Sequence, residues 1–383
     1  MHQSREPGYR LAGMLLGLLL AAGPALPPAE PRPGGNDEQA ALQQIADQLV
    51  AEYQVPGMLL GLIRDGQLVA RAASGIRHAH HPEVLLTSED CGHLGSCGKA
   101  LTATLAGLLV DQGRIEWDDT IEHRLPGLAG RIDPAYHEVT LGQLLKHRGG
   151  VPANGAPWRA GGEASRQNRM EIVARGLETR PGERVVGQFA YSNLGYLVAA
   201  LMMESATGET WEDLMRIHLL EPLQLESAGY GPPSTDKRIQ HPWGHAASST
   251  GAQPVSLDNP PSMAPAGTLH MNLEDWARFA RLHLDPPAES DDRRLTLSGP
   301  TRDYLHQPGG SGTAYAGGWL VRRLPAGQTE LSHEGSNTFW LASIVLRPGQ
   351  RSGILVITNQ SPQTSSPANQ AAIGRITKLI EAP

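Results

Sequence analysis

The chain has 383 residues, a formal net charge of -7, 40% apolar residues and 19% charged residues. This length predicts two to three domains or one two-lobed unit. The composition excludes wholesale disorder, and a negative charge without any block of basic residues excludes nucleic acid as an expected partner.

The first 25 residues have the layout of a secretory signal peptide. Two arginines precede the apolar stretch 11–22, and small residues follow at Gly23 and Ala25. An uncleaved anchor is the alternative, but this stretch is shorter than the roughly 20 residues that a helix needs to cross a bilayer. We expect cleavage near Ala25, a Pro/Gly-rich leader at 26–35, a periplasmic or secreted mature protein, and no stable membrane span after signal removal.

A helix followed by a hairpin is predicted next. Apolar residues recur with helical spacing over 42–53, with Asn36 or Asp37 as the cap. Two strand-like segments, 58–63 and 67–73, then flank Asp65-Gly66, which is typical of a tight hairpin turn.

The remaining expected elements are a run of helices, then a run of strands, and last a closing helix. Helices are expected at 101–109, 141–146, 194–203 and 211–220, with a closing helix at about 367–380. Strands are expected at 318–323, 330–332, 339–346 and 353–359, with a turn at 347–350 between the last two.

This order predicts an α/β fold of the α+β type. An antiparallel sheet of about five strands is expected to be flanked by N- and C-terminal helices, with a mostly helical lobe inserted in the middle. Residues 36–90 and 310–383 are expected to form the sheet lobe and residues 91–309 the helical lobe. A cleft between two such lobes is where a small-molecule or peptide substrate is expected to bind.

Ser96 and Lys99 form the first motif with chemical potential. The chain has four lysines among its 32 basic residues, and a partly buried lysine gives up its proton where an arginine does not. At a spacing of three residues, Ser96 and Lys99 share one face of a helix, and a serine in the first turn lies near free backbone N–H groups. The pair suits a serine nucleophile activated by a neutral lysine.

The alternative for this motif is a helix-capping serine with a solvated lysine. A second Ser-x-x-Lys, at 234–237, lies among prolines without an apolar helical run behind it. Ser96, in contrast, leads directly into the apolar segment 101–109, which favours the functional interpretation.

Tyr191-Ser192-Asn193 is the second motif. A phenol near a lysine is either held as phenolate or passes a proton to a leaving group. The Asn193 amide is able to orient Lys99 and a substrate carbonyl. A surface tyrosine followed by a helix-capping asparagine is the alternative.

His333-Glu334-Gly335-Ser336 is the third motif and ends a predicted strand. Gly335 lets a substrate approach the backbone closely. The N–H groups of Ser336 and Ser96 are candidates for an oxyanion hole.

The three motifs, about 95 and then 142 residues apart, resemble those of the serine β-lactamase/penicillin-binding-protein superfamily, and of its class C-like serine hydrolases in particular. The likeness runs from about residue 37 to 380 and implies a β-lactamase/transpeptidase-like fold. It implies Ser96 as the acylated nucleophile, Lys99 as its proton acceptor and Tyr191 as a general acid/base. We expect no cofactor and no metal. The implied substrate-binding residues are Asn193, His333, Gly335 and Ser336.

Departures from the family pattern bear on the substrate. His333-Glu334-Gly335 stands where class C β-lactamases usually carry Lys-Thr-Gly, whose lysine and threonine help to hold the substrate carboxylate. His333 is expected to be neutral or partly charged near pH 7 and Glu334 negative, so an anionic β-lactam loses attraction there. Segment 147–150 and Thr338 also depart from the pattern and alter the shape of the pocket.

These features predict a secreted serine hydrolase that acts through an acyl-enzyme on small esters, D-amino-acid amides or cell-wall peptides. A class C-like β-lactamase is the enzymatic alternative. A penicillin- or peptidoglycan-fragment-binding protein without turnover is the non-enzymatic one.

Other polar residues have simpler interpretations. Cys91 and Cys97 are either a disulfide that holds the loop before Ser96 or two small buried thiols. The histidines at 78, 80 and 81 are expected to lie in a solvated loop, with a zinc site as the alternative. The paired carboxylates at 118–119 and 291–292 are expected on the surface.

Overall fold

The computed structural model of the chain describes residues 35–154, 163–182, 184–235, 239–285, 295–310 and 312–381. The predicted signal peptide and almost all of the leader lie outside these ranges, as do Asp291-Asp292 and Lys237. In the described part of the chain, no helix is both long and apolar enough to cross a bilayer.

Helices and strands fall in a mixed order. The strands are β1 (Gly57–Arg64), β2 (Gln67–Gly75), β3 (Gly92–His93), β4 (Gly229–Tyr230), β5 (Gly244–Ser248), β6 (Gly251–Val255), β7 (Leu269–Met271), β8 (Leu320–Arg323), β9 (Thr329–Gly335), β10 (Leu341–Arg347) and β11 (Ser352–Thr358). The helices are α1 (Gly35–Tyr53), α2 (Gly98–Asp111), α3 (Ile121–Arg124), α4 (Leu141–Leu145), α5 (Arg166–Gly176), α6 (Asn193–Thr207), α7 (Trp211–Met215), α8 (Ala264–Gly267), α9 (Leu273–Leu284), α10 (Gly299–His306) and α11 (Pro362–Glu381).

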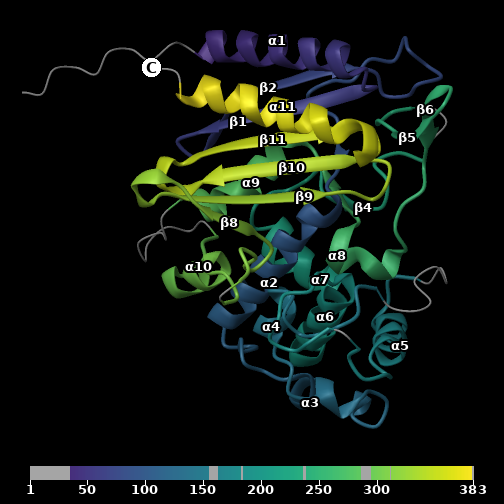
Figure 1. The fold of residues 1–383 in the computed structure, drawn as a ribbon, viewed down its shortest axis with the longest axis vertical. Coiled ribbons are helices and arrows are strands. Elements are labelled where there is room, and N and C mark those ends of the chain that lie inside the picture. The colour runs from purple at the N-terminus through teal and green to yellow at the C-terminus, as the bar shows by residue number, and fades with distance from the viewer. Residues whose placement is uncertain are drawn as a thin grey trace, which may run out of the picture. The chain divides into compact units, whose positions relative to one another are not determined.

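The main sheet has six antiparallel strands in the order β2-β1-β11-β10-β9-β8 (Figure 1). Both ends of the chain contribute to it, because β1 pairs with β11 from Met58 opposite Thr358 to Ile63 opposite Gly353. The predicted mixed fold is confirmed, with one strand more than the five expected. The predicted hairpin is also found, and its turn residues Asp65 and Gly66 have φ of 49° and 74°, as a tight turn between twisted strands requires.

Helices cover both faces of this sheet. Figure 1 shows α1 and α11 together on one face, where Leu42, Leu60 and Ile376 belong to one buried apolar cluster. Alternate residues of the same strands, such as Leu59 and Ile344, face the larger cluster that includes α2 and α9. Burial on both faces explains why β1 and β11 are almost continuously apolar instead of alternating.

Two helices with apolar residues all round lie in the larger cluster. Residues 98–109 of α2 and 194–204 of α6 are all buried, as expected for helices without a polar face. A Ser192 cap begins α6, and Gly208, in the left-handed conformation, ends it. Because α2 passes through the interior, a polar side chain near its start has little access to water.

Some boundaries differ from expectation. The closing helix begins at Pro362 and continues through Pro367, although the sequence suggested a start at the second proline. The third-motif strand β9 is longer than predicted and extends through Gly335. The predicted helix 211–220 is a short α-helix followed by a π-helical turn, Arg216–Leu220. The described residues from Gly35 onward form one compact unit, and the predicted lobe boundaries stay a prediction.

Candidate active site

Ser96 lies immediately before α2, in the 3₁₀ turn Gly95–Cys97, instead of in the first turn of the α-helix. Lys99 is the second residue of α2, and its Nζ is 3.0 Å from Ser96 Oγ and 2.6 Å from the carbonyl oxygen of Ala266. Ser96 is half-buried, so its hydroxyl is reachable, whereas Lys99 is fully buried. The structure thus brings the two residues of the first motif together as predicted.

Burial sets the protonation of Lys99. Loss of hydration lowers the pKa of the ammonium group to about 7, because an apolar interior disfavours the charged form. The hydrogen-bond partners of Nζ in the described structure are a hydroxyl and a carbonyl, and neither is a carboxylate that would hold the charge. Near pH 7 a large fraction of Lys99 is a neutral amine next to the serine hydroxyl.

Tyr191 joins the same group. Its hydroxyl lies close enough to Ser96 to lower the pKa of the phenol, and the Lys99 Nζ lies 5.0 Å from the centre of its ring. Burial raises the pKa of the phenol to about 12, although the interaction with Ser96 partly opposes this shift. Tyr191 therefore keeps its proton near pH 7, which favours the proton-passing alternative over a phenolate.

The end of β9 packs directly against the serine turn. A Cβ atom added to Gly335 would lie 2.0 Å from the Leu94 carbonyl oxygen and 2.6 Å from the Ser96 nitrogen. A Cβ added to Gly95, which has φ of +50°, would lie 2.2 Å from the Ser336 nitrogen. The two glycines therefore let the backbone at Ser96 and the backbone at Ser336 meet at one contact, and the two N–H groups remain candidates for one oxyanion hole.

His333 and Glu334 lie on opposite faces of β9. His333 is buried beneath the site, where its Nδ1 donates to the Glu334 carbonyl (2.6 Å) and its Nε2 accepts from the Tyr315 hydroxyl (3.0 Å). Burial and the neighbouring Lys99 charge lower the His333 pKa to about 3, so the ring is neutral, within the expected range. Glu334 lies opposite Ser343 of β10 in the strand register. The Ser343 hydroxyl accepts from Asn369 of α11, so the Glu334 side chain is also on the α11 face of the sheet.

The beta-lactamase family model matches residues 42–377 of the chain. The chain belongs to the beta-lactamase family. It is a serine hydrolase of that family, with the β-lactamase/penicillin-binding-protein fold, as the motifs predicted.

Known members and solved structures place this beta-lactamase-family chain among diverse relatives. It is 27% identical to penicillin-binding protein 4 of Amycolatopsis lactamdurans over 338 residues, which cover 86% of the chain and 87% of that protein. It is 25% identical to the unguisins hydrolase ungD' of Aspergillus campestris over 88% of the chain, and it spans 64% of that protein. The D-amino acid amidase from Ochrobactrum anthropi SV3, solved with L-phenylalanine amide, shares the fold: its TM-score is 0.71 at 19% identity, over 90% of this chain and 99% of that one.

Asn193 does not reach Lys99 through any hydrogen bond between described residues. Its amide nitrogen donates to Asn154 Oδ1 at 3.0 Å. Nor does Asn193 cap α6, since that position belongs to Ser192, whose hydroxyl accepts from the Gly195 N–H. Its predicted contact with substrate stays a prediction.

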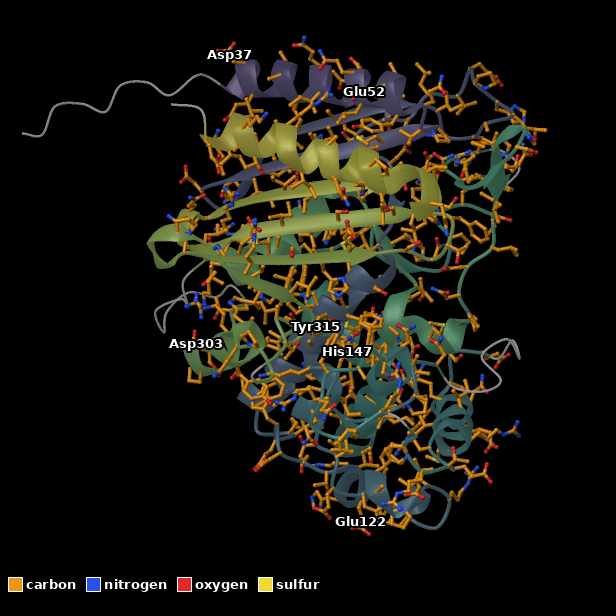
Figure 2. The ribbon with its side chains drawn as sticks, viewed as in Figure 1. Asp37, Glu52, Glu122, His147, Asp303 and Tyr315 are labelled. Carbon is orange, nitrogen blue, oxygen red and sulfur yellow. The ribbon has the colours of Figure 1, made fainter. Side chains whose placement is uncertain are left out.

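Two aromatic residues of the site were not singled out in the sequence. Figure 2 labels His147 and Tyr315, whose ring centres are 4.5 Å apart (Figure 2). The His147 ring also lies 4.2 Å from the Tyr191 ring, and its Nδ1 accepts from the Ser192 N–H, so it holds the second motif in place. His147 was noted in the sequence only within segment 147–150, as a departure from the family pattern, and Tyr315 belongs to none of the motifs.

The remaining polar candidates are the two cysteines and the histidines at 78, 80 and 81. Cys97 follows Ser96 directly, with its Sγ on the His333 carbonyl at 3.5 Å. Cys91 and Cys97 are free, buried thiols, and burial raises the Cys91 pKa to about 11 and the Cys97 pKa further, so both stay protonated. His78 packs its ring 4.9 Å from Trp243. No set of three or more His, Cys, Asp or Glu among the described residues is arranged to hold a metal ion.

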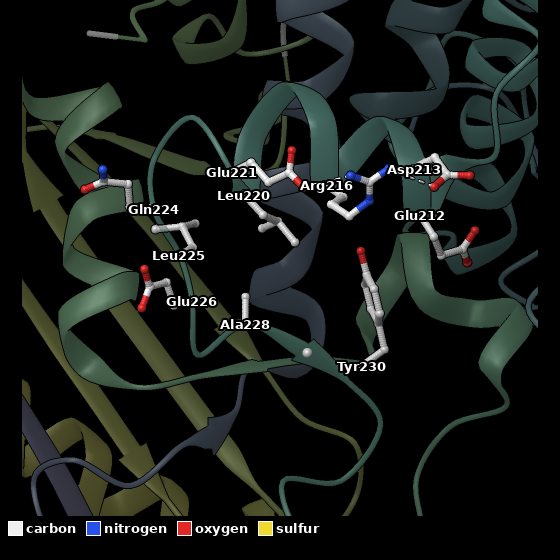
Figure 3. Close-up of a pocket in the computed structure, with 11 residues that line it drawn as sticks. Glu212, Asp213, Arg216, Leu220, Glu221, Gln224, Leu225, Glu226, Ala228 and Tyr230 are labelled. Carbon is white, nitrogen blue, oxygen red and sulfur yellow. Dashed lines mark hydrogen bonds and ion pairs between the residues drawn. The ribbon is translucent and has the colours of Figure 1, made fainter.

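A separate surface pocket of about 500 Å³ lies between α7, the following π-helical turn and β4 (Figure 3). Four of its eleven lining residues are acidic, and its arginine, Arg216, is paired with Asp213 and Glu221. None of the motif residues lines it. The chemistry of the chain is therefore argued from Ser96 and its neighbours.

Proposed function

We propose that the chain is a secreted serine hydrolase that acts through an acyl-enzyme on small esters, D-amino-acid amides or cell-wall peptides. The observation that carries the proposal is the 3.0 Å contact between Ser96 Oγ and the Nζ of a fully buried Lys99. A neutral amine at hydrogen-bond distance from a reachable hydroxyl is the requirement for activating a serine without a histidine base.

In acylation, the Lys99 amine takes the Ser96 proton while Oγ attacks the substrate carbonyl. The N–H groups of Ser96 and Ser336 stabilise the negative charge on the carbonyl oxygen. As the tetrahedral intermediate collapses, Tyr191 gives its proton to the leaving alcohol or amine, and Lys99 returns the serine proton to Tyr191. The acyl group is then an ester of Ser96.

In deacylation, water attacks that ester along the reverse proton route. The Tyr191 and Lys99 pair takes a proton from water, the same N–H groups stabilise the second intermediate, and Ser96 leaves as a hydroxyl with its proton restored. The Tyr191 phenol, whose pKa is raised to about 12, is suited to this relay because it is protonated at the start of each step.

The absence of a cation at His333 and Glu334 of β9 favours a substrate without a carboxylate at this position. His333 is neutral and hydrogen-bonded to Tyr315, and Glu334 is on the other face of the strand. The residues at the position of the family's Lys-Thr-Gly thus present no cation to a substrate carboxylate. This favours esters and amides over β-lactams, and the fold shared with a D-amino acid amidase agrees with it.

A class C-like β-lactamase is the second candidate, because the matching family model is that of the beta-lactamases.

The proposal that the protein is secreted rests on the N-terminal residue pattern. N-terminal sequencing of protein from the periplasm or medium tests it, and a chain that retains residues 1–25 inside the cell would contradict it.

Turnover by purified protein tests the catalytic proposal. The substrates are p-nitrophenyl acetate, D-phenylalanine amide, a D-alanyl-D-alanine peptide and nitrocefin, each with wild type, Ser96→Ala and Ser234→Ala. The last variant removes the serine of the second Ser-x-x-Lys and is the matched control. We expect ester or amide turnover that is lost in Ser96→Ala alone. Equal turnover in all three proteins would refute the proposal, and nitrocefin hydrolysis alone would favour the β-lactamase.

A further inference from the structure

A buried carboxylate, Asp258, contacts both backbone segments that meet at the proposed oxyanion hole. Its Oδ2 is 2.9 Å from His93 Nε2, and its Oδ1 is 3.0 Å from Asn337 Nδ2. His93 stands three residues before Ser96, and Asn337 follows Ser336 directly. The exposed fraction is 5% for the Asp258 side chain, 0% for His93 and 3% for Asn337. Water therefore does not compete for these hydrogen bonds.

The His93 branch has a single proton arrangement. The Gly95 N–H donates to His93 Nδ1 at 3.0 Å, so Nδ1 must carry a lone pair. The ring proton is then on Nε2, from which it is donated to Asp258. Asp258 thereby fixes the tautomer that allows His93 to hold the backbone of Gly95, the residue next to Ser96.

The Asn337 branch holds the other side. The Asn337 amide nitrogen donates to Asp258, and its oxygen accepts from the Phe339 N–H at 3.1 Å. Within this loop the Ser336 hydroxyl accepts from the N–H of Thr338, which has φ of +89°. A non-glycine residue in this conformation persists only where its surroundings hold it.

The residue after Asp258 reaches the lysine end of the site. The Asn259 backbone N–H donates to Asp258 Oδ1 at 2.7 Å, and its amide donates to the Gly267 carbonyl at 2.9 Å. Gly267 is next to Ala266, whose carbonyl accepts from Lys99. One carboxylate and its neighbour are thus connected to the serine turn, the β9 edge and the lysine.

We propose that Asp258 is a positioning residue that sets the spacing of the Ser96 and Ser336 N–H groups through His93 and Asn337. This inference rests on the function proposed above. A hydrogen-bond donor must lie within a few tenths of an ångström of its place to stabilise a developing oxyanion. Tying both donors to one rigid buried group achieves this without contact between Asp258 and substrate.

Substitution of Asp258 by asparagine is nearly isosteric and tests the role directly. In the wild-type protein three donors bind the Asp258 carboxylate. The side-chain amide of the asparagine variant has one oxygen acceptor in place of two. Asp258→Asn is expected to lower kcat for p-nitrophenyl acetate about 10- to 100-fold, with KM within about threefold of wild type. The rate at which a fluorophosphonate labels Ser96 should fall by the same factor.

Two variants of His93 separate the two halves of its branch. An asparagine places its oxygen near the position of Nδ1, so His93→Asn keeps the acceptor for the Gly95 N–H. A glutamine places its amide nitrogen near Nε2, so His93→Gln keeps the donor to Asp258 but loses that acceptor. If Asp258 acts through this branch, His93→Asn lowers kcat even though it keeps the acceptor for the Gly95 N–H, because its bond to Asp258 is lost.

Asp275→Asn is the matched control. Asp275 is also buried and accepts from the Ser227 N–H and hydroxyl, but it has no bond to either segment of the oxyanion hole. We expect both aspartate variants to lower Tm, and only Asp258→Asn to lower kcat. A kcat within twofold of wild type in Asp258→Asn, or an equal loss in Asp275→Asn, would overturn the inference.

The outcomes separate the two levels of proposal. A wild-type protein that is folded but neither labelled at Ser96 nor active refutes the proposed function, and the inference with it. Labelling of wild type and Asp258→Asn at equal rates refutes the positioning role alone. If Asp258→Asn does not fold, His93→Asn decides, because it loses the bond to Asp258 and keeps the Gly95 acceptor: a kcat within twofold of wild type refutes the role, and a larger loss supports it.

Discussion

A lowered lysine pKa does not by itself identify a catalytic base in this chain. Lys146 is also buried, and burial, followed by the nearby Arg148 charge, lowers its pKa to about 8. Its ammonium lies 3.7 Å from the centre of the Tyr304 ring, and within the described part of the chain it makes no hydrogen bond to a serine hydroxyl. Lys99 differs in its partner, the Ser96 hydroxyl. At the scale of single residues, geometry and desolvation together distinguish the functional lysine from the structural one.

The pKa of Lys99 predicts how activity depends on pH. Below about pH 7 the amine is protonated and is not available as a base, and above it the amine is neutral. The value of kcat/KM for p-nitrophenyl acetate should therefore rise about tenfold per pH unit below pH 7 and level off above it. His333 does not contribute, because its pKa is lowered to about 3. A profile that is flat between pH 5 and 8, or that falls with rising pH, would contradict Lys99 as the base.

Removal of one oxygen tests the role of Tyr191. In Tyr191→Phe the ring still packs against His147, but the hydroxyl at Ser96 is lost. We expect kcat to fall by about 10² to 10⁴ and Tm to change little. Tyr136→Phe is the control, because the Tyr136 hydroxyl is buried without a hydrogen-bond partner in the described structure, and its removal should leave kcat unchanged. Similar activities of the two variants would rule out a proton relay through Tyr191.

At the scale of elements, the site depends on close contact between the end of β9 and the turn before α2. Gly335→Ala would place a methyl group 2.0 Å from the Leu94 carbonyl and 2.6 Å from the Ser96 nitrogen. Because backbone atoms cannot rotate away, the turn must shift, and we expect at least a 100-fold loss of kcat with a lower Tm.

Gly374→Ala is the opposite case. Gly374 is in α11, and nothing lies within 4 Å of its added Cβ. This change should raise the free energy of unfolding by about 0.5–1 kcal/mol and leave kcat as it is. For both glycine variants, melting followed by circular dichroism measures the stability, and p-nitrophenyl acetate turnover measures kcat. Normal activity in Gly335→Ala would show that the contact does not shape the site.

Elements with a strong local pattern were predictable from the sequence. The helix α1, the hairpin around Asp65-Gly66 and the interior of α6 follow from periodicity and turn chemistry alone. The strands β3 and β4 have two residues each, too few for any pattern. The start of α11 was misplaced because Pro367, normally a helix breaker, lies inside the helix.

The site was predictable as far as its motifs reach. Ser96, Lys99 and Tyr191 come together as expected, since short motifs carry them. Asp258 had no local signal, because its partner His93 is 165 residues away in the sequence. A hydrogen-bond network of this kind depends on the tertiary contact of loops, which no periodicity encodes.

At the scale of the whole molecule, the helices around the site are held by a buried charge cluster. Arg169 of α5 bonds to Glu204 of α6 and, at 2.8 and 2.9 Å, to Glu212 of α7. Arg169 and Glu204 are fully buried. Arg169→Met leaves a buried carboxylate without its cation, which costs about 3–5 kcal/mol, so we expect Tm to fall by roughly 5 °C.

The control for this prediction is Arg175→Met, on the same helix. Arg175 pairs with Glu171 on the surface, and an exposed pair of this kind contributes little, so its Tm should stay close to that of wild type. Both proteins should keep wild-type kcat at temperatures where they are folded, because neither arginine contacts the site. Equal melting temperatures of the two variants would contradict a stabilising role of the cluster.

The central claim is that Ser96 is the nucleophile, and peptide mapping by mass spectrometry tests it most directly. Wild-type protein is treated with a fluorophosphonate, digested and compared with Ser96→Ala. The account predicts one added phosphonyl group, located on Ser96, and none on the Ser96→Ala variant. An adduct on any other residue, or a folded wild-type protein that stays unmodified, would contradict it.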